Sequence, residues 1–194
     1  MILNRLALDV QQRHVFRDSG DVYELHSTVS TLTRELPPGD GRVLWSQPQR
    51  RLLLIQATGV IDADNLPAGY TLESADAVRL EHGRGETVSW SLIANPTIQR
   101  SRTRVRSAVP LEQRDDWVRG KLQPALVVGD LSGQQHTVRG GLQRSTGKRV
   151  CHVHHVWSGT ATVADADALR RLILCGVGRA RGFGCGLLLV GGAA

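Results

Sequence analysis

The hydrophobic pattern of this chain changes period several times, and these changes constrain the fold more than any other feature. The opening stretch ILNRLALDV alternates apolar and polar residues, which is typical of a β-strand. A helix is predicted after this strand, and it ends at PPGDG (37–41) because proline cannot continue a helix. RVLWSQ and RRLLLIQATG then read as two strands joined by a turn near Pro48. The possible N-caps of the predicted helix are Asp18, Ser19 and Asp21. Its apolar face, at helical spacing, consists of Val22, Leu25, Val29, Leu32 and Leu36.

The remaining elements predict that this arrangement occurs twice. Residues 62–80 leave room for a short helix and a closing strand near AVRLE, which completes a split βαβ order. The second half adds a strand in TVSWSLIANPTIQR, a helix in LEQRDDWVRGKL, a hairpin over 134–163, a helix in DADALRRLILCGVG and a strand in CGLLLV. The apolar face of the helix in LEQRDDWVRGKL is expected to consist of Leu111, Trp117, Val118 and Leu122. We therefore predict an α+β protein of two tandem ferredoxin-like (RRM-like) domains, at 1–83 and 87–194.

The composition excludes several classes of protein. No apolar run reaches the roughly 18 residues of a membrane span. The N-terminus turns polar early, so we expect neither a signal peptide nor a membrane anchor. The three cysteines, Cys151, Cys175 and Cys185, are odd in number and form no CxxC pair. We therefore expect no disulfide framework, and a cytoplasmic location.

Positive charge is concentrated in the second half of the chain. Residues 100–149 contain 11 basic and 4 acidic side chains, whereas residues 1–99 contain 9 and 12. Such a segment favours a polyanionic partner, although a solvated basic face is the simpler alternative. Aromatic residues make up only 4% of the chain, so few rings are available for stacking single-stranded bases. If the partner is RNA, we expect a folded duplex.

A row of arginines is the clearest candidate for phosphate contacts. Arg100, Arg102, Arg104 and Arg106 alternate in sequence, so on an extended segment all four point to one side. We expect this row to bind phosphates; the alternative is a solvated edge strand. Lys148 and Arg149, after STG in the hairpin, could extend the same surface.

The stretch from Gly176 to Gly186 contains five glycines in eleven residues. It does not fit a dinucleotide fingerprint, because a helix precedes it and a strand follows it. It also lacks the Lys-Ser/Thr pair of a P-loop. One interpretation is a tight crossing from helix to strand. The other is a backbone surface that RNA phosphates approach, with Arg179 and Arg181 as counter-charges.

Two groups of residues could carry chemistry. Tyr23 and His26 are three apart on the predicted helix and therefore neighbours on one face, where a phenol and an imidazole can donate and accept protons. Either side chain could equally be structural. His152 and His154, in HVHH, could share a strand face, but no third ligand at a recognisable spacing accompanies them. We therefore expect exposed or hydrogen-bonded histidines here and no metal.

Several of these motifs, in the same order, occur together in one known family. The chain resembles the CasE family, the CRISPR repeat endoribonucleases of the type I-E Cascade complex. The resemblance runs nearly end to end, through MILNRLALD, RDSGDVYELHSTV, LIANPT, RVRSAVPL, the helix around Trp117 and GVGRARGFGCGLL. The second of these is similar to an R-D-x-x-x-x-Y-x-x-H block of the family.

The resemblance implies a specific activity in antiviral defence. The family has two ferredoxin-like domains, binds the repeat hairpin of CRISPR precursor RNA, cuts it and stays attached as a subunit of Cascade. Cleavage needs no metal or other cofactor: the 2′-hydroxyl attacks the adjacent phosphate, giving a 2′,3′-cyclic phosphate and a 5′-hydroxyl. The family's histidine matches His26, which we assign to proton transfer. Its tyrosine matches Tyr23, which we assign to positioning or the complementary transfer, leaving acid and base open.

The chain also departs from the family. Some relatives carry basic residues where this chain has Ser27 and Thr31, and arginine where it has Ile93. The compensating charge would then come from Arg34 or from an arginine of the glycine-rich stretch. One alternative is therefore a catalytically weak subunit that binds the hairpin. Another is a metal-dependent nuclease using His152 and His154. If the glycines contact RNA, valine at Gly182 or Gly184 should weaken binding without unfolding the protein.

Overall fold

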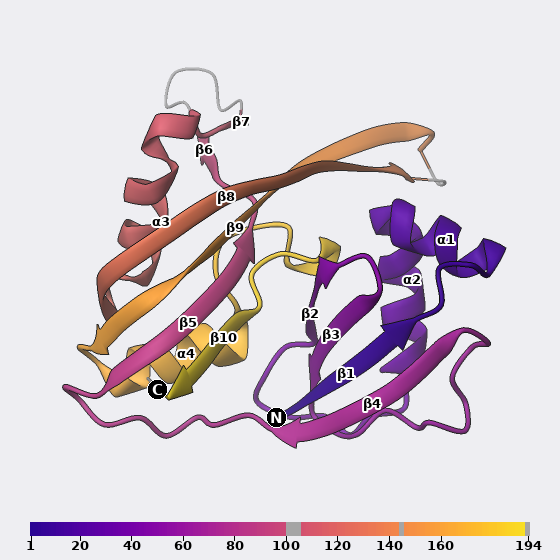
Figure 1. Ribbon diagram of the computed structural model, residues 1–194, viewed down its shortest axis with the longest axis horizontal. Helices are drawn as coiled ribbons and strands as arrows, with labels where there is room; N and C mark the ends of the chain where they lie inside the picture. Colours follow the sequence, from indigo (N-terminus) through magenta and orange to yellow (C-terminus); the bar gives the residue numbers. More distant parts are fainter. Residues whose placement is uncertain (100–105, 144–145, 193–194) are drawn as a thin grey trace.

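The computed structural model describes residues 1–99, 106–143 and 146–192, and its main strands form two antiparallel sheets of four (Figure 1). The first sheet has the order β2-β3-β1-β4, and the second β10-β5-β9-β8. If the strands are counted within each half, both sheets run second, third, first, fourth, so one unit occurs twice, as predicted. The strands of the first sheet are β1 (Ile2–Leu8), β2 (Leu44–Gln49), β3 (Leu52–Ala57) and β4 (Tyr70–Ala77). Those of the second are β5 (Thr87–Ala94), β8 (Leu126–Gln143), β9 (Lys148–Val163) and β10 (Leu188–Gly192).

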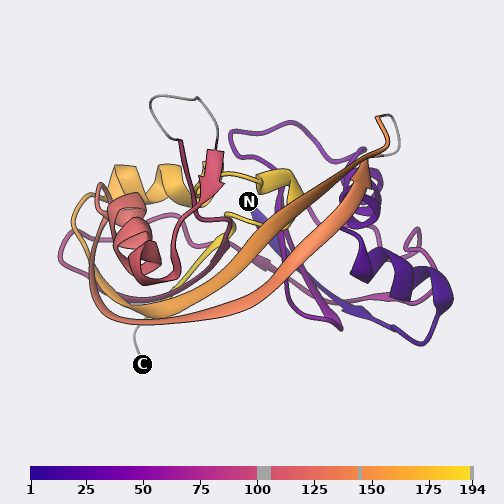
Figure 2. The same ribbon diagram turned by 90° about the horizontal axis from the view of Figure 1, so that it is seen from above.

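Each sheet buries one face beneath its own helices (Figures 1 and 2). Helices α1 (Arg13–Gly20) and α2 (Val22–Leu32) cover the first sheet. Helices α3 (Arg114–Leu122) and α4 (Ala166–Cys175) cover the second. The two cores are separate: Leu6, Leu25, Val29, Leu53 and Ile55 belong to the first, and Trp90, Val118, Leu122, Trp157 and Leu169 to the second. Among the described residues no helix is long and apolar enough to cross a membrane.

Three expectations about elements need correction. The helix expected around residues 18–36 is preceded by an unpredicted helix, α1, and ends at Leu32. No helix forms at 62–69, where the Asp62 carboxylate accepts from the Asp64 N–H and the Asn65 amide and so folds the chain into a turn. Strand β4 accordingly begins at Tyr70 and ends before most of AVRLE. Leu111, placed on the apolar face of α3, is exposed in a 3₁₀ turn, η1 (Leu111–Gln113).

The hairpin β8–β9 extends well beyond its sheet. Strand β9 pairs with β5 only from His155 to Thr162, so its first residues pair with β8 alone. The free arm passes over the first sheet and reaches α1 and α2 (Figure 1). A small hairpin of β6 (Thr97–Gln99) and β7 (Arg106–Ala108) lies at the opposite end, beside α3.

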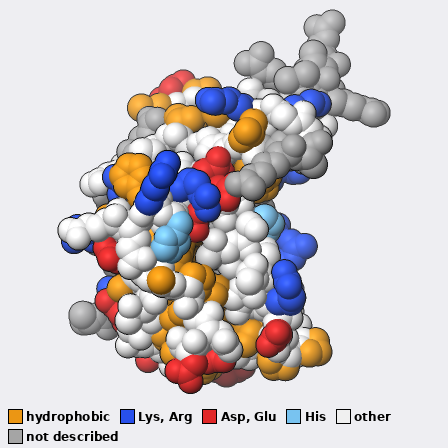
Figure 3. All heavy atoms as spheres, turned by 90° about the vertical axis from the view of Figure 1, so that its right-hand side faces the viewer, with side chains coloured by type: hydrophobic (Ala, Val, Ile, Leu, Met, Phe, Trp, Pro, Cys, Tyr) orange, Lys and Arg blue, Asp and Glu red, His pale blue; other side chains and the backbone are white. Residues whose placement is uncertain are grey.

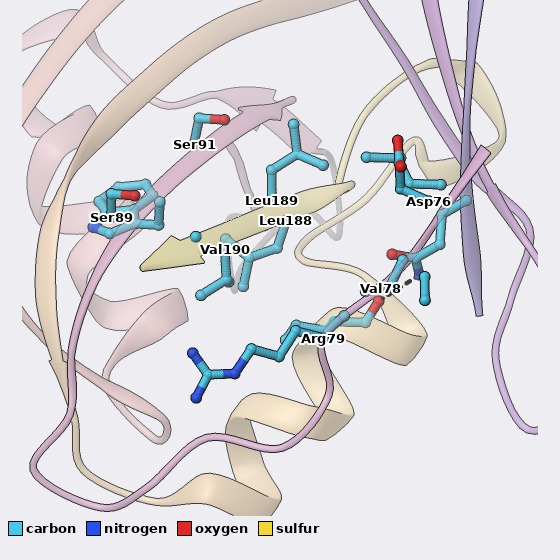
Figure 4. Close-up of a pocket in the computed structure, with 14 residues that line it drawn as sticks. Asp76, Val78, Arg79, Ser89, Ser91, Leu188, Leu189 and Val190 are labelled. Atoms are coloured by element: carbon cyan, nitrogen blue, oxygen red, sulfur yellow. Dashed lines mark hydrogen bonds between the residues drawn. The ribbon is translucent and has the colours of Figure 1, made fainter. Parts of the chain in front are cut away.

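The two halves share a small buried contact and an apolar groove. Leu44 and Leu54 of the first sheet pack on Leu187, and the Gln56 side chain donates to the Ile173 carbonyl at 2.8 Å. The groove lies between the linker after β4 and strand β10, where Val78, Leu188 and Val190 line it (Figure 4). None of the residues predicted for catalysis or RNA binding lines this groove. The Arg79 guanidinium, which also lines it, is bound by Glu86 at 2.8 and 3.1 Å.

The glycine-rich stretch is a tight crossing from α4 to β10. Gly176, Gly178, Gly184 and Gly186 have positive φ values between 75° and 88°, which side chains rarely adopt. A Cβ on Gly184 would lie 2.7 Å from the Trp45 ring, and one on Gly186 would lie 2.6 Å from the Val177 carbonyl oxygen. Packing within the protein therefore explains these glycines. The expectation that valine at Gly184 would leave the fold intact is wrong, because both φ and space oppose it.

This packing predicts the stability of two matched variants. Gly184→Ala should lower the free energy of unfolding by about 3 kcal/mol, because left-handed strain and overpacking act together. Gly85→Ala should lose only about 1 kcal/mol, because Gly85 has a similar φ of 84° but open space around it. Urea unfolding of both variants measures the difference, and equal losses would show that the contact with Trp45 does not matter.

Candidate active site

Tyr23 and His26 occupy the first two turns of α2, which begins at a strong cap. The Asp21 side chain accepts from the Tyr23 N–H at 2.7 Å and from the Glu24 N–H at 3.3 Å, so it satisfies two of the free N–H donors at the start of the helix. Leu25 and Val29 of the same helix are buried and fix its rotation. Tyr23 and His26 therefore remain half-buried on the side that faces the crossing.

The ring of Phe183 brings the two side chains together with the glycine-rich crossing. Phe183 belongs to a 3₁₀ turn, η2 (Arg181–Phe183), in the middle of that crossing. Its ring centroid lies 4.8 Å from that of Tyr23 and 5.4 Å from that of His26. The main chain before it is also close, because a Cβ on Gly182 would lie 3.5 Å from His26 Cε1. Residues about 160 positions apart in sequence thus form one site.

The long hairpin holds the same helix from the other side. The Leu142 N–H donates to the second carboxylate oxygen of Asp21 at 3.2 Å, so the residue that caps α2 also binds β8. The Arg139 guanidinium donates to the Ser19 carbonyl. A Cβ on Gly141 would lie 2.6 Å from the Tyr23 ring, so only glycine allows the strand to approach this closely. The hairpin therefore contributes to positioning Tyr23.

A third ring, that of His152, also contacts Phe183. Its ring stacks on Phe183 at 5.0 Å with an interplanar angle of 21°. Its Nδ1 accepts from the Asn95 amide at 3.2 Å, which fixes the ring. Burial lowers the pKa of His152, so its neutral form is favoured. The expectation of a hydrogen-bonded histidine is confirmed for this residue.

A second buried contact anchors the segment that follows the arginine row. Arg114 Nη1 donates to His155 Nδ1 at 3.2 Å, and its Nε donates to the Val109 carbonyl at 3.0 Å. Burial, with the positive charge of Arg114 as a smaller cause, lowers the pKa of His155. His155 therefore accepts as a neutral ring. Within the described ranges, no three His, Cys, Asp or Glu side chains are placed to hold a metal ion.

The predicted phosphate-binding residues are spread over three places. Arg100, Arg102 and Arg104 lie outside the described residues. Arg106 is exposed on β7, whereas Lys148 and Arg149 lie at the hairpin tip above α1 and α2 (Figure 1). These described residues therefore lie at separate ends of the molecule and form no single surface. Figure 3 shows the side of the molecule that lies at the right in Figure 1, where basic and acidic side chains mix. On α1, Arg17 pairs with Asp18 at 3.1 Å and with Glu24 of α2 at 3.9 Å.

The two arginines of the crossing have different surroundings. Arg181 donates from Nε to the Gly178 carbonyl at 2.9 Å and from Nη1 to the Cys175 carbonyl at 2.8 Å. It therefore braces the end of α4, a structural contact that its spacing did not predict. Arg179 is exposed.

Sequence reasoning missed three members of this site. Phe183 stands in RGFG, which resembles a strand motif of RNA-recognition domains only weakly, and here it lies in a turn. Gly141 could have been found, because a glycine inside a strand pattern indicates close approach of another segment. Asn95 stands in LIANPT, one of the stretches that resemble the family, but only the fold brings it to His152.

The class of protein is defined by two tandem ferredoxin-like domains, with the glycine-rich crossing of the second packed against Trp45 of the first. The family model of CRISPR-associated proteins matches residues 1–191, so the chain belongs to this family. No curated protein sequence matches it. The predicted resemblance to CasE and the predicted fold class are both confirmed.

Solved structures superpose over almost the whole chain. The CRISPR endoribonuclease Cse3 bound to a 19-nucleotide RNA has 25% identity and a TM-score of 0.86, covering 98% of this chain and 100% of its own. Cas6e from Escherichia coli K-12 has 23% identity and a TM-score of 0.74, with 100% of each chain covered. A chain of E. coli Cascade bound to a double-stranded DNA target has 20% identity and a TM-score of 0.60, again over 100% of each chain.

The lowered pKa of His155 predicts how stability depends on pH. The unfolded state takes up a proton near the ordinary histidine pKa of about 6.5, whereas the folded state resists it. The stabilising contribution is therefore present above that pH and is lost as the pH falls below it. His155→Gln keeps an acceptor for Arg114 but does not titrate, so its stability should fall less between pH 7.5 and 5.5. Thermal unfolding across this range provides the measurement, and parallel curves for variant and wild type would contradict the interpretation.

Proposed function

We propose that this protein is a metal-independent endoribonuclease that cuts the repeat hairpin of CRISPR precursor RNA and stays bound to the product as a Cascade subunit. The observation that carries this proposal is the convergence of Tyr23 and His26 on Phe183 of the glycine-rich crossing. Membership of the CRISPR-associated family and the likeness to RNA-bound Cse3 support the substrate. The likeness to a Cascade chain supports the assembly.

The chemistry follows from what RNA itself supplies. The 2′-hydroxyl at the cut attacks the adjacent phosphorus, a base takes its proton, and the P–O5′ bond breaks as an acid protonates the leaving 5′-oxygen. The products are a 2′,3′-cyclic phosphate and a 5′-hydroxyl, so one proton is taken and one is given. We assign His26 to one transfer, and Tyr23 to the other or to positioning the phosphate. RNA carries its own nucleophile, so geometry and proton transfer are what the protein must supply.

We assign the basic residues predicted to contact RNA to binding it rather than to cutting it. Lys148 and Arg149 lie at the tip of an arm long enough to reach past α2. We infer that the β8–β9 arm contacts the stem of the RNA hairpin and that Arg106 contacts RNA at the α3 end. Arg100, Arg102 and Arg104, which lie outside the described residues, stay predicted RNA contacts. In this arrangement Arg179 and Gly182 lie nearest the cut, whereas Gly184, predicted to bind RNA, is buried against Trp45 and supports the loop. Arg181 acts chiefly through the loop it braces.

A cleavage assay with three arms tests the proposal. With the cognate repeat hairpin in excess EDTA, wild type should cut at its normal rate. His26→Ala should lose a factor of about 100 or more, as expected for general acid–base catalysis. A hairpin with a 2′-deoxy nucleotide at the cut should bind but stay whole. Cleavage stopped by EDTA, or normal cleavage by His26→Ala, would overturn the mechanism.

A catalytically weak binding subunit is the second candidate. Ser27 and Thr31 are both exposed on α2. Because their side chains are uncharged, neither replaces the positive charge that some relatives have there. This candidate predicts that wild type binds the hairpin tightly yet forms almost no product, a result the same assay would reveal.

A further inference from the structure

A hollow with three arginines lies beside the glycine-rich crossing. Its walls are the side chains and main chain of Arg42, Gly178, Arg179, Ala180, Arg181 and Gly182. Gly182 belongs to this wall and is also the residue whose Cβ would lie 3.5 Å from His26 Cε1. Gly182 therefore lies both in the wall of the hollow and next to the proposed catalytic histidine.

Arg42 reaches the hollow from the first half of the chain. Its backbone N–H donates at 2.9 Å to the Leu174 carbonyl, near the end of α4. Gly41, just before it, lies so close that a Cβ there would be 2.6 Å from the Met1 sulfur and 3.2 Å from Leu174. The segment before β2 is thus fixed against the second domain, and Arg42 with it. Its position in sequence, just after PPGDG, gave no indication of this.

The arginines of the hollow form no ion pair with the residues that the structure describes. None of the six residues in its wall is acidic, and neither Arg42 nor Arg179 forms an ion pair with any described residue. Arg181 uses Nε and Nη1 on carbonyls, which leaves Nη2 without a partner among the described side chains and backbone. Three arginines thus line one hollow with no carboxylate among its lining residues. Their positive charges repel one another, and a bound anion would relieve that repulsion.

The backbone of the wall is also in an unusual conformation. Ala180 has a φ of 58°, the only left-handed non-glycine residue in the described chain. Such a conformation is strained and persists where the surroundings impose it, often at ligand sites. Together with Gly178, at a φ of 75°, it curves the main chain around the hollow. Guanidinium groups suit phosphate because they can donate two parallel hydrogen bonds to it.

We propose that this hollow binds a backbone phosphate of the RNA next to the cut, with Arg42 as a cation supplied by the first domain. The inference rests on the proposed function and deepens it. Arg42 then contributes part of the positive charge that Ser27 and Thr31 do not. Arg42 holds the RNA backbone in register with His26 without taking part in proton transfer.

Binding of an uncleavable hairpin tests the role of Arg42 directly. The RNA carries a 2′-deoxy nucleotide at the cut, and the variants are Arg42→Gln and, as a control with the same change of charge, Arg84→Gln in the exposed linker. Arg42→Gln should bind about tenfold more weakly at 0.15 M salt, with a log–log salt slope lower by roughly 0.7–0.9, the loss of one phosphate contact. Arg84→Gln should match wild type. Wild-type affinity and slope for Arg42→Gln would overturn the inference.

Uncharged linkages identify the phosphate. A set of hairpins, each with one methylphosphonate near the cut, is compared on wild type and on Arg42→Gln. At the linkage that Arg42 contacts, wild type and Arg42→Gln should bind equally, because the methylphosphonate has already removed the charge that Arg42 would bind. If the tenfold difference persists at every linkage near the cut, the hollow does not bind that part of the RNA.

Two further readouts separate this inference from the proposed function. If wild type cuts the unmodified hairpin while Arg42→Gln binds and cuts normally, only the inference fails. If wild type neither binds nor cuts, the proposed function fails, and the RNA ligand of the hollow fails with it. Titration with inorganic pyrophosphate, followed by NMR of the arginine side chains, then shows whether the hollow holds free phosphate instead. Signals of Arg42 and Arg179 that do not move would exclude that ligand too.

Discussion

The contact between Trp45 and the glycine-rich crossing is the interaction on which the rest of the site depends. The indole N–H donates to the Gly182 carbonyl at 3.1 Å, and Gly184 lies directly against the ring. Trp45 is fully buried in the core of the first domain, so this contact fixes the crossing relative to β2. Phe183 lies between these two glycines, and its place against α2 follows from theirs. A side chain at Gly184 would displace the crossing and with it the platform for His26.

Around that platform the protein assembles one site from three distant segments. Helix α2 supplies Tyr23 and His26, the crossing supplies Phe183, and β9 supplies His152. Asp21 connects the first segment to the hairpin because its two carboxylate oxygens serve different partners. None of the segments forms the site alone, so the relative placement of the two domains is itself part of the geometry of the proposed active site. The buried contact of Gln56 with Ile173 helps to keep that placement.

How far the sequence could be read depended on the range of the interaction concerned. The strands around Leu53 and Leu92 and the helix around Leu25 follow from local period, and the two sheets share one strand order, as a repeated unit requires. Tyr23 and His26 were found because a helix brings positions three apart together. Helix α1 was missed because its apolar residues are few. Leu111 was misplaced because the chain is still a 3₁₀ turn there. Arg181 was taken for a free cation, although the two carbonyls that bind it lie only three and six residues earlier in the chain.

The sequence by itself determined the repeated α+β unit, the position of Tyr23 and His26 on one helix face, and the crossing from helix to strand. These depend on periodicity, capping and glycine, which act over a few residues. Only the tertiary structure decided what the glycines are for, which rings surround Phe183 and which arginines meet. Those outcomes depend on packing between residues more than a hundred positions apart, such as Trp45 against Gly184 and Arg42 beside Arg179. A single sequence does not encode such distances in any local pattern, because they are set by how the two domains meet.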